Sequence, residues 1–159
     1  MIFRLIDPDQ THIAEAARIW EAGWHDAHAV IVPKQLVEVR TLSSFLVRLE
    51  SNLQRTRIGV NGDEVLGFCI VKDDELDQMY VSHKARGHGL AQLLMADAEN
   101  RLRNSGYTSA RLACAVGNQR AARFYEKSGW KNAGVRNVDL DTAQGTFPLP
   151  IWRFEKQLT

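Results

Sequence analysis

Two glycines in a basic loop mark a segment of this sequence that could bind an anion. Gly87 and Gly89 flank His88 and come directly before residues 90–102, where apolar residues recur at helical spacing. Glycine lets a ligand approach the backbone closely, and the free N–H groups at the start of a helix can point at an anion. Such a loop suits a pyrophosphate. The alternative is that both glycines only form a tight turn between a strand and a helix.

Other phosphate-binding motifs do not match this loop. A dinucleotide-binding fingerprint needs a third glycine where the chain has Gln92, and the Gly-Lys-Ser/Thr of a P-loop is absent. Residues 84–89 read Lys-Ala-Arg-Gly-His-Gly. They resemble the acyl-CoA-binding motif Gln/Arg-x-x-Gly-x-Gly/Ala of the GCN5-related N-acetyltransferases, the GNAT superfamily. Lys84 stands where the family has Gln or Arg, a departure that keeps a hydrogen-bond donor.

A second block, residues 118–130, strengthens this resemblance. It reads Asn-Gln-Arg-Ala-Ala-Arg-Phe-Tyr-Glu-Lys-Ser-Gly-Trp. The block is similar to the family's other signature, Asn-x-x-Ala-x-x-Phe/Leu-Tyr-x-x-x-Gly-Phe, and follows the first at the family's usual separation. Together the two blocks cover residues 76–130, and the order of the flanking elements extends a weaker resemblance over nearly the whole chain.

The resemblance implies that acetyl-CoA binds as a cosubstrate and that no metal is needed. The glycine loop would hold the pyrophosphate, and backbone amides of the preceding strand would bind the pantetheine arm and the thioester oxygen. Asn118 would bind the CoA arm or a water beside it, although it also suits the N-cap of a helix. The implied cofactor-binding residues are Met79, Tyr80, Val81, Lys84, Arg86, Gly87, His88, Gly89, Leu90, Asn118 and Tyr125.

Acetyl transfer to an amine needs a base, because an ammonium has no lone pair with which to attack. Asp77 and Glu75 are the catalytic candidates, since both lie at the start of the strand before the loop. Strict alternation would place them on one face with Met79 and Val81. Many relatives carry Glu at the position of Asp77, so the resemblance favours Asp77, acting directly or through water. The alternative is that either acid only solvates the end of a strand.

The departing thiolate needs a proton, and Tyr125 is the catalytic acid implied by its match to the signature tyrosine. Asn118 and Tyr125 are two helical turns apart, so their side chains share one face and can line one cleft. Phe124 is then expected to point toward the core. The alternative for Tyr125 is a core aromatic with a satisfied hydroxyl.

Residues 24–33 have no clean period and are expected to form a loop or a broken helix, in which two histidines and an acid lie beside a tryptophan. Their spacing matches no established metal site. In the resembled family this region lines the acceptor pocket, which makes Trp24, His25 and His28 candidates for substrate contact. The alternative is a set of exposed polar loop residues.

The remaining pattern predicts an α/β (α+β) fold: a mixed, mostly antiparallel sheet with helices on both faces and a splayed central cleft, as in the GNAT fold. Apolar residues at helical spacing predict helices near residues 13–24, weakened at Gly23, and at 41–53. Alternation and turn residues predict strands at 3–6, 57–60, 65–71, 76–81, 110–116, 132–140 and 148–156. The length fits one N-acetyltransferase domain, residues 1–159.

Composition excludes several classes of protein. A net charge of +1, with no basic patch, disfavours a nucleic-acid binder, and no apolar run is long enough for a membrane span. The N-terminus lacks a basic segment followed by a hydrophobic one, so a cytoplasmic protein is expected. Cys69 and Cys114 lie in apolar runs and are expected to be buried thiols, with a catalytic cysteine as the alternative.

Two functions remain. The first is an N-acetyltransferase that acts on a small-molecule or peptide amine by direct transfer in a ternary complex. The second is a CoA-binding sensor or interaction module without catalysis, against which the retained Asn118 and Tyr125 argue. The sequence does not identify the amine, the length of the acyl donor or the oligomeric state, and a homodimer is among the open states.

Overall fold

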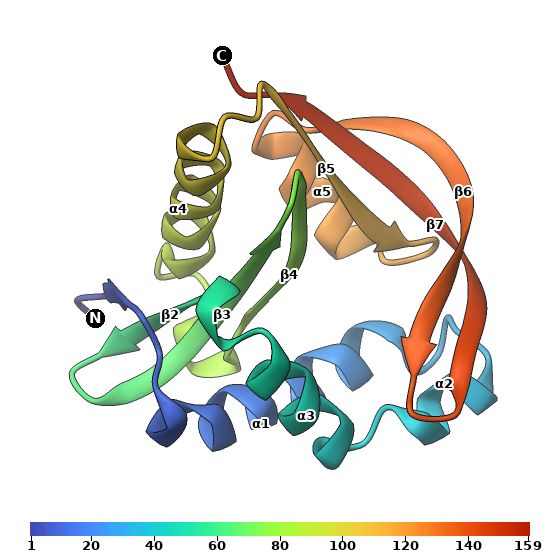
Figure 1. Ribbon diagram of the computed structural model, residues 1–159, viewed down its shortest axis with the longest axis horizontal. Coiled ribbons are helices and arrows are strands. Elements are labelled where there is room, and N and C mark those ends of the chain that lie inside the picture. The colour runs from blue at the N-terminus through green and yellow to red at the C-terminus, as the bar shows by residue number, and fades with distance from the viewer.

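The computed structural model describes residues 1–159 as a mixed sheet with flanking helices (Figure 1). The strands are β1 (Arg4–Ile6), β2 (Thr56–Asn61), β3 (Glu64–Lys72), β4 (Glu75–Val81), β5 (Ser109–Ala115), β6 (Lys131–Thr142) and β7 (Gly145–Gln157). The helices are α1 (Ile13–His28), α2 (Lys34–Val39), α3 (Leu42–Ser51), α4 (Leu90–Asn104) and α5 (Gln119–Lys127), with short 3-10 turns at Gln10–His12, Leu53–Arg55 and His83–Ala85. None of these helices has the length and apolar character needed to cross a membrane.

β4 lies at the centre of the sheet. The strand order is β1-β2-β3-β4-β5-β7-β6. All neighbouring strands are antiparallel except β4 and β5, which are parallel and share a single register pair, Glu75 opposite Arg111. The two strands start together and then diverge (Figure 1). Most of the β4 edge that faces β5 therefore has no backbone partner.

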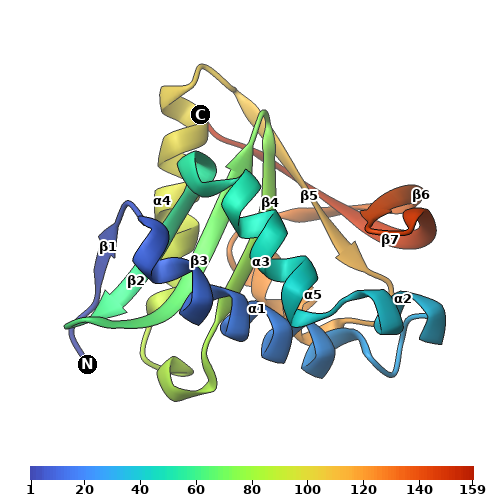
Figure 2. The same ribbon diagram turned by 60° about the horizontal axis from the view of Figure 1, so that its bottom comes forward.

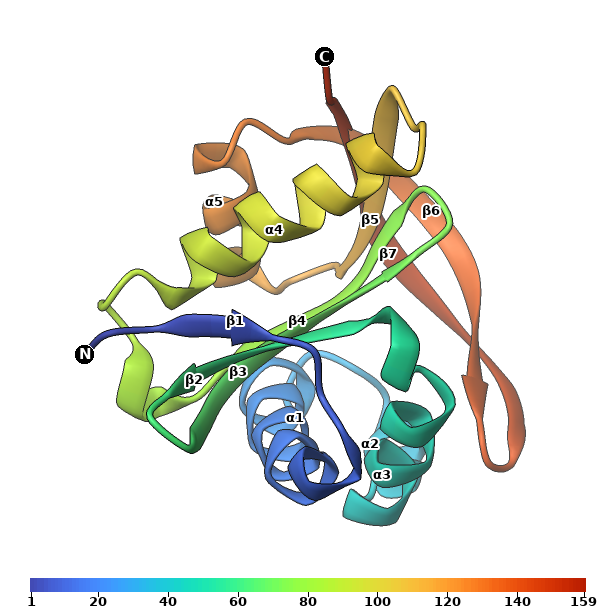
Figure 3. The same ribbon diagram turned by 60° about the vertical axis from the view of Figure 1, so that its left-hand side comes forward.

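Helices cover both faces of this sheet. α4 and α5 lie on one face, and α1, α2 and α3 lie on the other (Figure 3). α1 and α3 pack side by side in front of the sheet (Figure 2). The predicted mixed, mostly antiparallel sheet with helices on both faces is confirmed.

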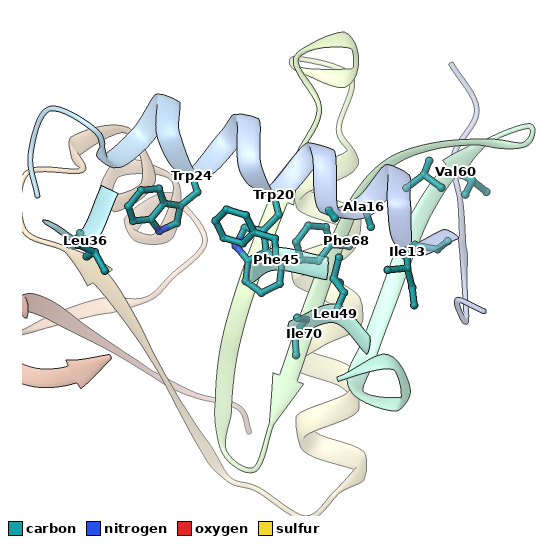
Figure 4. Close-up of a cluster of buried hydrophobic side chains, with 14 of the residues drawn as sticks. Ile13, Ala16, Trp20, Trp24, Leu36, Phe45, Leu49, Val60, Phe68 and Ile70 are labelled. Atoms are coloured by element: carbon teal, nitrogen blue, oxygen red, sulfur yellow. The ribbon is translucent and has the colours of Figure 1, made fainter. Parts of the chain in front are cut away.

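Each layer of helices encloses its own core. Beneath α1 and α3, Trp20 packs against Phe45 and Phe68 with ring centroids 5.0 and 5.3 Å apart (Figure 4). On the opposite face, Leu90 and Leu94 of α4 belong to the second cluster and are fully buried. Burial of these side chains fixes the helices on the sheet and so fixes the space between them.

α1 continues to His28, so the expected loop or broken helix at residues 24–33 is wrong for its first part. Gly23 does not end the helix, because the ring of Tyr80 packs where its side chain would be: a Cβ there would lie 2.7 Å from Tyr80 Cδ1. Trp24 is 7% exposed and anchors the last turn in the core. This packing outweighs the cost of about 1 kcal/mol for glycine in a helix.

Two further elements differ from the sequence prediction. α2 is not predicted, because a single short helix after Pro33 has too few residues for a periodic signal. The last two strands are longer than predicted and continue through residues 141–146 to a tight turn. The resulting β6–β7 hairpin extends beyond the sheet toward α2 (Figures 1 and 3).

Candidate active site

The divergence of β4 and β5 opens one continuous cleft of about 1840 Å³. Residues 85–87, residues 89–92 and α5 line what we call the loop half of the cleft. The end of α1, α2, α3 and the β6–β7 hairpin line the hairpin half. Single small-ligand pockets have volumes of roughly 300–1,000 Å³, so this cleft has room for two molecules at once.

The glycine loop presents backbone rather than side chains. Gly87 and Gly89 have φ of 79° and 90°, in the left-handed region, and nothing lies within 4 Å of where a Cβ would be at either residue. Gly89 is the N-cap of α4, whose first N–H groups have no partner within the helix. Open space in front of these free donors fits a pyrophosphate.

The start of α4 packs closely against two glycines of β2 and β3, which the sequence analysis did not identify. A Cβ at Gly59 would lie 2.5 Å from Leu90 Cδ1, and one at Gly67 would lie 3.1 Å from Leu90 Cδ2. Only glycine lets Leu90 come this close, so these residues set the position of the helix N-terminus. Glycine inside a strand pattern is the signal that could have found them.

The charged side chains of the loop are placed differently from its backbone. Lys84 Nζ donates to Glu64 Oε2 at 2.7 Å, and neither Lys84 nor His88 lines the cleft. Arg86 does line it, and its Nη2 lies 3.4 Å from Asp26 Oδ2 at the end of α1. Of the loop's basic side chains, only that of Arg86 is therefore placed to contact a ligand in the cleft.

β4 contains a β-bulge at Asp77 that the sequence does not predict. Ile70 of β3 pairs with Gln78, and the next residue, Val71, pairs with Leu76. Asp77 therefore has no partner on β3. A bulge bends its strand and turns the extra side chain in a new direction, and bulges are common beside active sites.

The bulge changes which residues of β4 share a face. Leu76 belongs to the same core cluster as Met79 and Val81, whereas Tyr80 packs in the other cluster. Strict alternation would instead have grouped Leu76 with Tyr80. The prediction of one shared face is therefore wrong for the set Glu75, Asp77, Met79 and Val81, because it assumed an unbroken strand.

Glu75 lies at the closed end of the cleft, where β4 and β5 pair. Arg111 of β5 donates from Nη1 to Glu75 Oε2 at 3.0 Å and from Nε to Asp74 Oδ1 at 3.1 Å. Burial raises the pKa of Glu75 to about 7; Arg111 opposes this rise, and a hydrogen bond and the charge of Asp77 add to it. The Glu75 carboxyl therefore holds a proton in acid and releases it near neutral pH.

Asn118 and Tyr125 line the cleft opposite β4. Asn118 Oδ1 accepts a hydrogen bond from the Ala121 N–H at 3.3 Å, so Asn118 caps α5 and also lines the cleft. Burial raises the pKa of Tyr125 well above its usual value, and Cys114 and Tyr80 raise it further. The Tyr125 hydroxyl therefore keeps its proton at neutral pH and can donate it.

Phe124 also lines the cleft, although the sequence predicts that it points toward the core. Its ring lies 5.8 Å from that of Tyr125, and it packs against the second core cluster as well. α5 is short and amphipathic, so a residue next to its cleft-facing stripe contacts both the core and the cleft.

Trp24 and His28 of α1 line the hairpin half of the cleft, and the centroids of their rings are 4.9 Å apart. His28 Nδ1 donates to the Trp24 carbonyl at 2.8 Å. Burial lowers the pKa of His28, and the charges of Arg40 and His25 lower it further, so His28 is neutral at pH 7. His25 is not on the wall; its Nε2 donates to the Arg40 carbonyl at 2.7 Å and ties α1 to the end of α2.

Arg40 and Arg48 also line the hairpin half, and the sequence analysis did not identify either. Arg40 follows α2 and is 3% exposed. Arg48 belongs to α3 and lies over the ring of Trp20, with its guanidinium carbon 4.4 Å from the ring centroid. A buried arginine is rare, but nothing in its local sequence distinguishes it from a surface arginine.

Comparison with solved structures finds the same fold in proteins of low sequence identity. A GCN5-related N-acetyltransferase from Rhodopseudomonas palustris superposes with a TM-score of 0.77 at 20% identity, covering 99% of this chain and 98% of that one. The PaiA N-acetyltransferase of Thermoplasma acidophilum, solved with coenzyme A, gives 0.69 at 18% identity, covering 99% of both chains. YncA of Salmonella typhimurium, solved with its cofactor acetyl-CoA, gives 0.70 at 14% identity, covering 100% and 95%.

Sequence comparison gives a complementary result. No curated protein matches the chain. The family profile described as "Acetyltransferase (GNAT) family" matches residues 13–130, most of the chain, from the start of α1 to the end of the second signature block. The splayed β4–β5 cleft, the glycine loop at α4 and the family match agree, and the chain belongs to the GNAT family of acetyltransferases.

Proposed function

We propose that the protein transfers an acetyl group from acetyl-CoA to a primary amine by direct attack in a ternary complex. The observation that carries this proposal is the placement of the Glu75–Asp77 carboxyl pair and the Tyr125 hydroxyl along one cleft that has room for two molecules. A base and an acid are the two proton-transfer groups that aminolysis of a thioester requires.

The loop half is the proposed site of acetyl-CoA. Free N–H groups at Gly87, Gly89 and the first turn of α4 would bind the pyrophosphate, and Arg86 adds a positive charge. The unpaired edge of β4 offers N–H groups to the pantetheine arm and to the thioester oxygen, where negative charge develops during attack. Coenzyme A and acetyl-CoA in the solved complexes of PaiA and YncA support acetyl-CoA as the ligand.

The proposed chemistry removes protons from the amine nitrogen and delivers one proton to the sulfur of the leaving thiolate. The Glu75–Asp77 pair accepts a proton from the ammonium, directly or through water, and the amine lone pair then attacks the thioester carbonyl carbon. The new C–N bond forms as the C–S bond breaks, and the nitrogen, now acylated, releases its second proton to solvent to give the neutral amide. Tyr125 donates its hydroxyl proton to the departing thiolate and is reprotonated from solvent.

Substitution of Tyr125 tests this function, because Tyr125→Phe keeps the ring and deletes only the donor. Thiol release from acetyl-CoA, measured against a panel of amines, should fall by roughly 100-fold or more, while acetyl-CoA affinity and melting temperature stay unchanged. Tyr107→Phe is the matched control, because Tyr107 does not line the cleft. Acetyl-CoA binding without thiol release for any amine would instead identify a binding module.

A further inference from the structure

Arg40 is a buried cation without a counter-ion. Glu99, the other charged residue that is fully buried, is paired with Lys156 at 2.8 Å and Arg103 at 3.5 Å. Arg40 forms no ion pair: its Nη1 donates to the Asp141 carbonyl at 2.9 Å, and its Nε is buried with no hydrogen-bond partner. Because an uncompensated buried charge is unfavourable, a negatively charged partner would stabilise this arrangement.

Arg48 places a second unpaired positive charge on the same wall. It is half-buried against Trp20 and lies close enough to Arg40 to lower the pKa of Arg40, which burial chiefly brings to about 10. Asp77 and Asp141 favour the charged form of Arg48, yet neither carboxylate lies within ion-pair distance of Arg40 or Arg48. Glu38 and Asp139 also line the hairpin half, but neither forms an ion pair with Arg40 or Arg48, so both guanidinium groups lack a carboxylate partner.

This charge arrangement is unsuited to some amines. A polyamine offers Arg40 and Arg48 no anionic acceptor and would leave the buried Nε of Arg40 without a hydrogen-bond partner. An amine with a separate anionic group would instead place its anion at the two arginines and its ammonium at the carboxyl pair. The planar guanidinium of arginine suits carboxylate and phosphate groups, which it can bind through two parallel hydrogen bonds.

We propose that Arg40 and Arg48 bind an anionic group of the acceptor, so that the substrate is a small amine that also carries a carboxylate or a phosphate. This inference rests on the proposed acetyl transfer. Arg48 and Asp77 line the same cleft, and the charge of Asp77 acts on Arg48, so an anion at the arginines and an ammonium at the carboxyl pair can belong to one small molecule.

The test compares acceptors that differ only in the anion: glycine with glycinamide, and phosphoethanolamine with ethanolamine. In at least one pair, kcat/KM should be about 10- to 100-fold higher for the anionic member, and the pair that shows this identifies the anion as carboxylate or phosphate. Arg48→Gln should bring that ratio close to one. Arg18→Gln, an exposed arginine of α1 outside the cleft, is the matched control and should leave the ratio unchanged.

Binding without turnover separates this inference from the proposed function. Calorimetric titration of N-acetylglycine, N-acetylglycinamide, phosphoethanolamine and ethanolamine requires no acetyl transfer, and an anionic ligand that binds wild type but not Arg48→Gln supports the anion site even if no amine is acetylated. Efficient acetylation of neutral amines or polyamines, with ratios at or below one, would overturn the anion site and leave acetyl transfer intact. Arg40→Lys retains the charge and should preserve part of the preference.

Discussion

The loop half of the cleft is built from one short stretch of chain, whereas the hairpin half is assembled from segments far apart in the sequence. The loop half presents mostly backbone N–H groups from residues 86–91, held by glycines and by the first turn of α4. The hairpin half presents side chains such as Trp24, Arg40, Arg48 and Asp141, which belong to four separate segments.

This difference separates binding of the donor, which the family shares, from recognition of the acceptor, which is specific to one member. Backbone donors at a helix N-terminus bind any ligand with the same phosphate arm, and their position depends only on glycine and helix geometry. Side chains from separate elements can change one at a time without disturbing that arm. The loop half is therefore the part suited to a common donor, and the hairpin half is the part suited to a particular acceptor.

The largest expected effect is at the loop. Gly89→Glu should weaken acetyl-CoA binding by about 1000-fold, because a carboxylate would face the pyrophosphate and a side chain at φ of 90° would strain the cap. Calorimetry measures the affinity. Gly106→Glu is the matched control: it also has positive φ and open space, but it follows the other end of α4. Equal affinity in a folded Gly89→Glu variant would disprove the loop assignment.

The next effect is at the boundary between the two halves. Because the raised pKa of Glu75 keeps the Glu75 carboxyl protonated below about pH 7, wild-type kcat/KM should rise with pH up to about 7 and then level off. Asp77→Asn should lower turnover roughly 100-fold at neutral pH, with partial recovery in alkali. It should also move the inflection to lower pH, since Asp77 raises the pKa of Glu75.

The pH profiles of wild type, Asp77→Asn and Asp63→Asn check this prediction. Asp63 lies in the turn between β2 and β3, away from the cleft, and serves as the control for loss of a carboxylate. A profile that is the same in all three proteins would assign the proton transfer to another group or to solvent.

A smaller effect is expected when a closely packed glycine in either half is replaced by alanine: one substitution should weaken binding of the acceptor and the other should weaken binding of acetyl-CoA. Gly23→Ala would place a Cβ 2.7 Å from Tyr80 Cδ1, so Tyr80 must move into the hairpin half, and the acceptor KM should rise about fivefold. Gly59→Ala would press on Leu90 instead and should weaken acetyl-CoA binding. If both variants changed the same parameter, the division of the cleft into two independent halves would be incorrect.

The smallest effect is expected at Lys84, which the family motif implies as a cofactor contact. Its ammonium group is paired with Glu64 on the surface, at 68% exposure of the Lys84 side chain. Lys84→Ala should therefore change acetyl-CoA affinity by less than about twofold and leave the melting temperature unchanged. A tenfold loss of affinity would indicate that Lys84 turns toward the phosphate when acetyl-CoA binds.

The sequence predicted the fold and the loop because both depend on local patterns. Apolar spacing predicted α3 and α4, and the glycine spacing predicted the turn before α4. The bulge at Asp77 was missed because it arises from the pairing of β4 with β3. The last turn of α1 was missed because Gly23 looks like a helix end until Tyr80 is placed against it.

The arginines of the hairpin half were missed for a different reason. Arg40 follows a short helix and Arg48 lies on an amphipathic one, so both look like ordinary surface residues. Only the approach of the β6–β7 hairpin and of Trp20 buries them. Burial of a charged residue is a property of the assembled fold, and the local sequence carries little information about it.

The central claim is that the two halves hold donor and acceptor together and that the acetyl group passes directly between them. Cys114 is the nucleophile that could contradict it, since it lines the cleft. Burial raises the pKa of the Cys114 thiol to about 12, so almost no reactive thiolate is present at neutral pH. Mass spectrometry of the intact protein after incubation with acetyl-CoA alone should therefore show an unmodified chain, whereas an acetyl group on Cys114 that a later amine removes would contradict direct transfer.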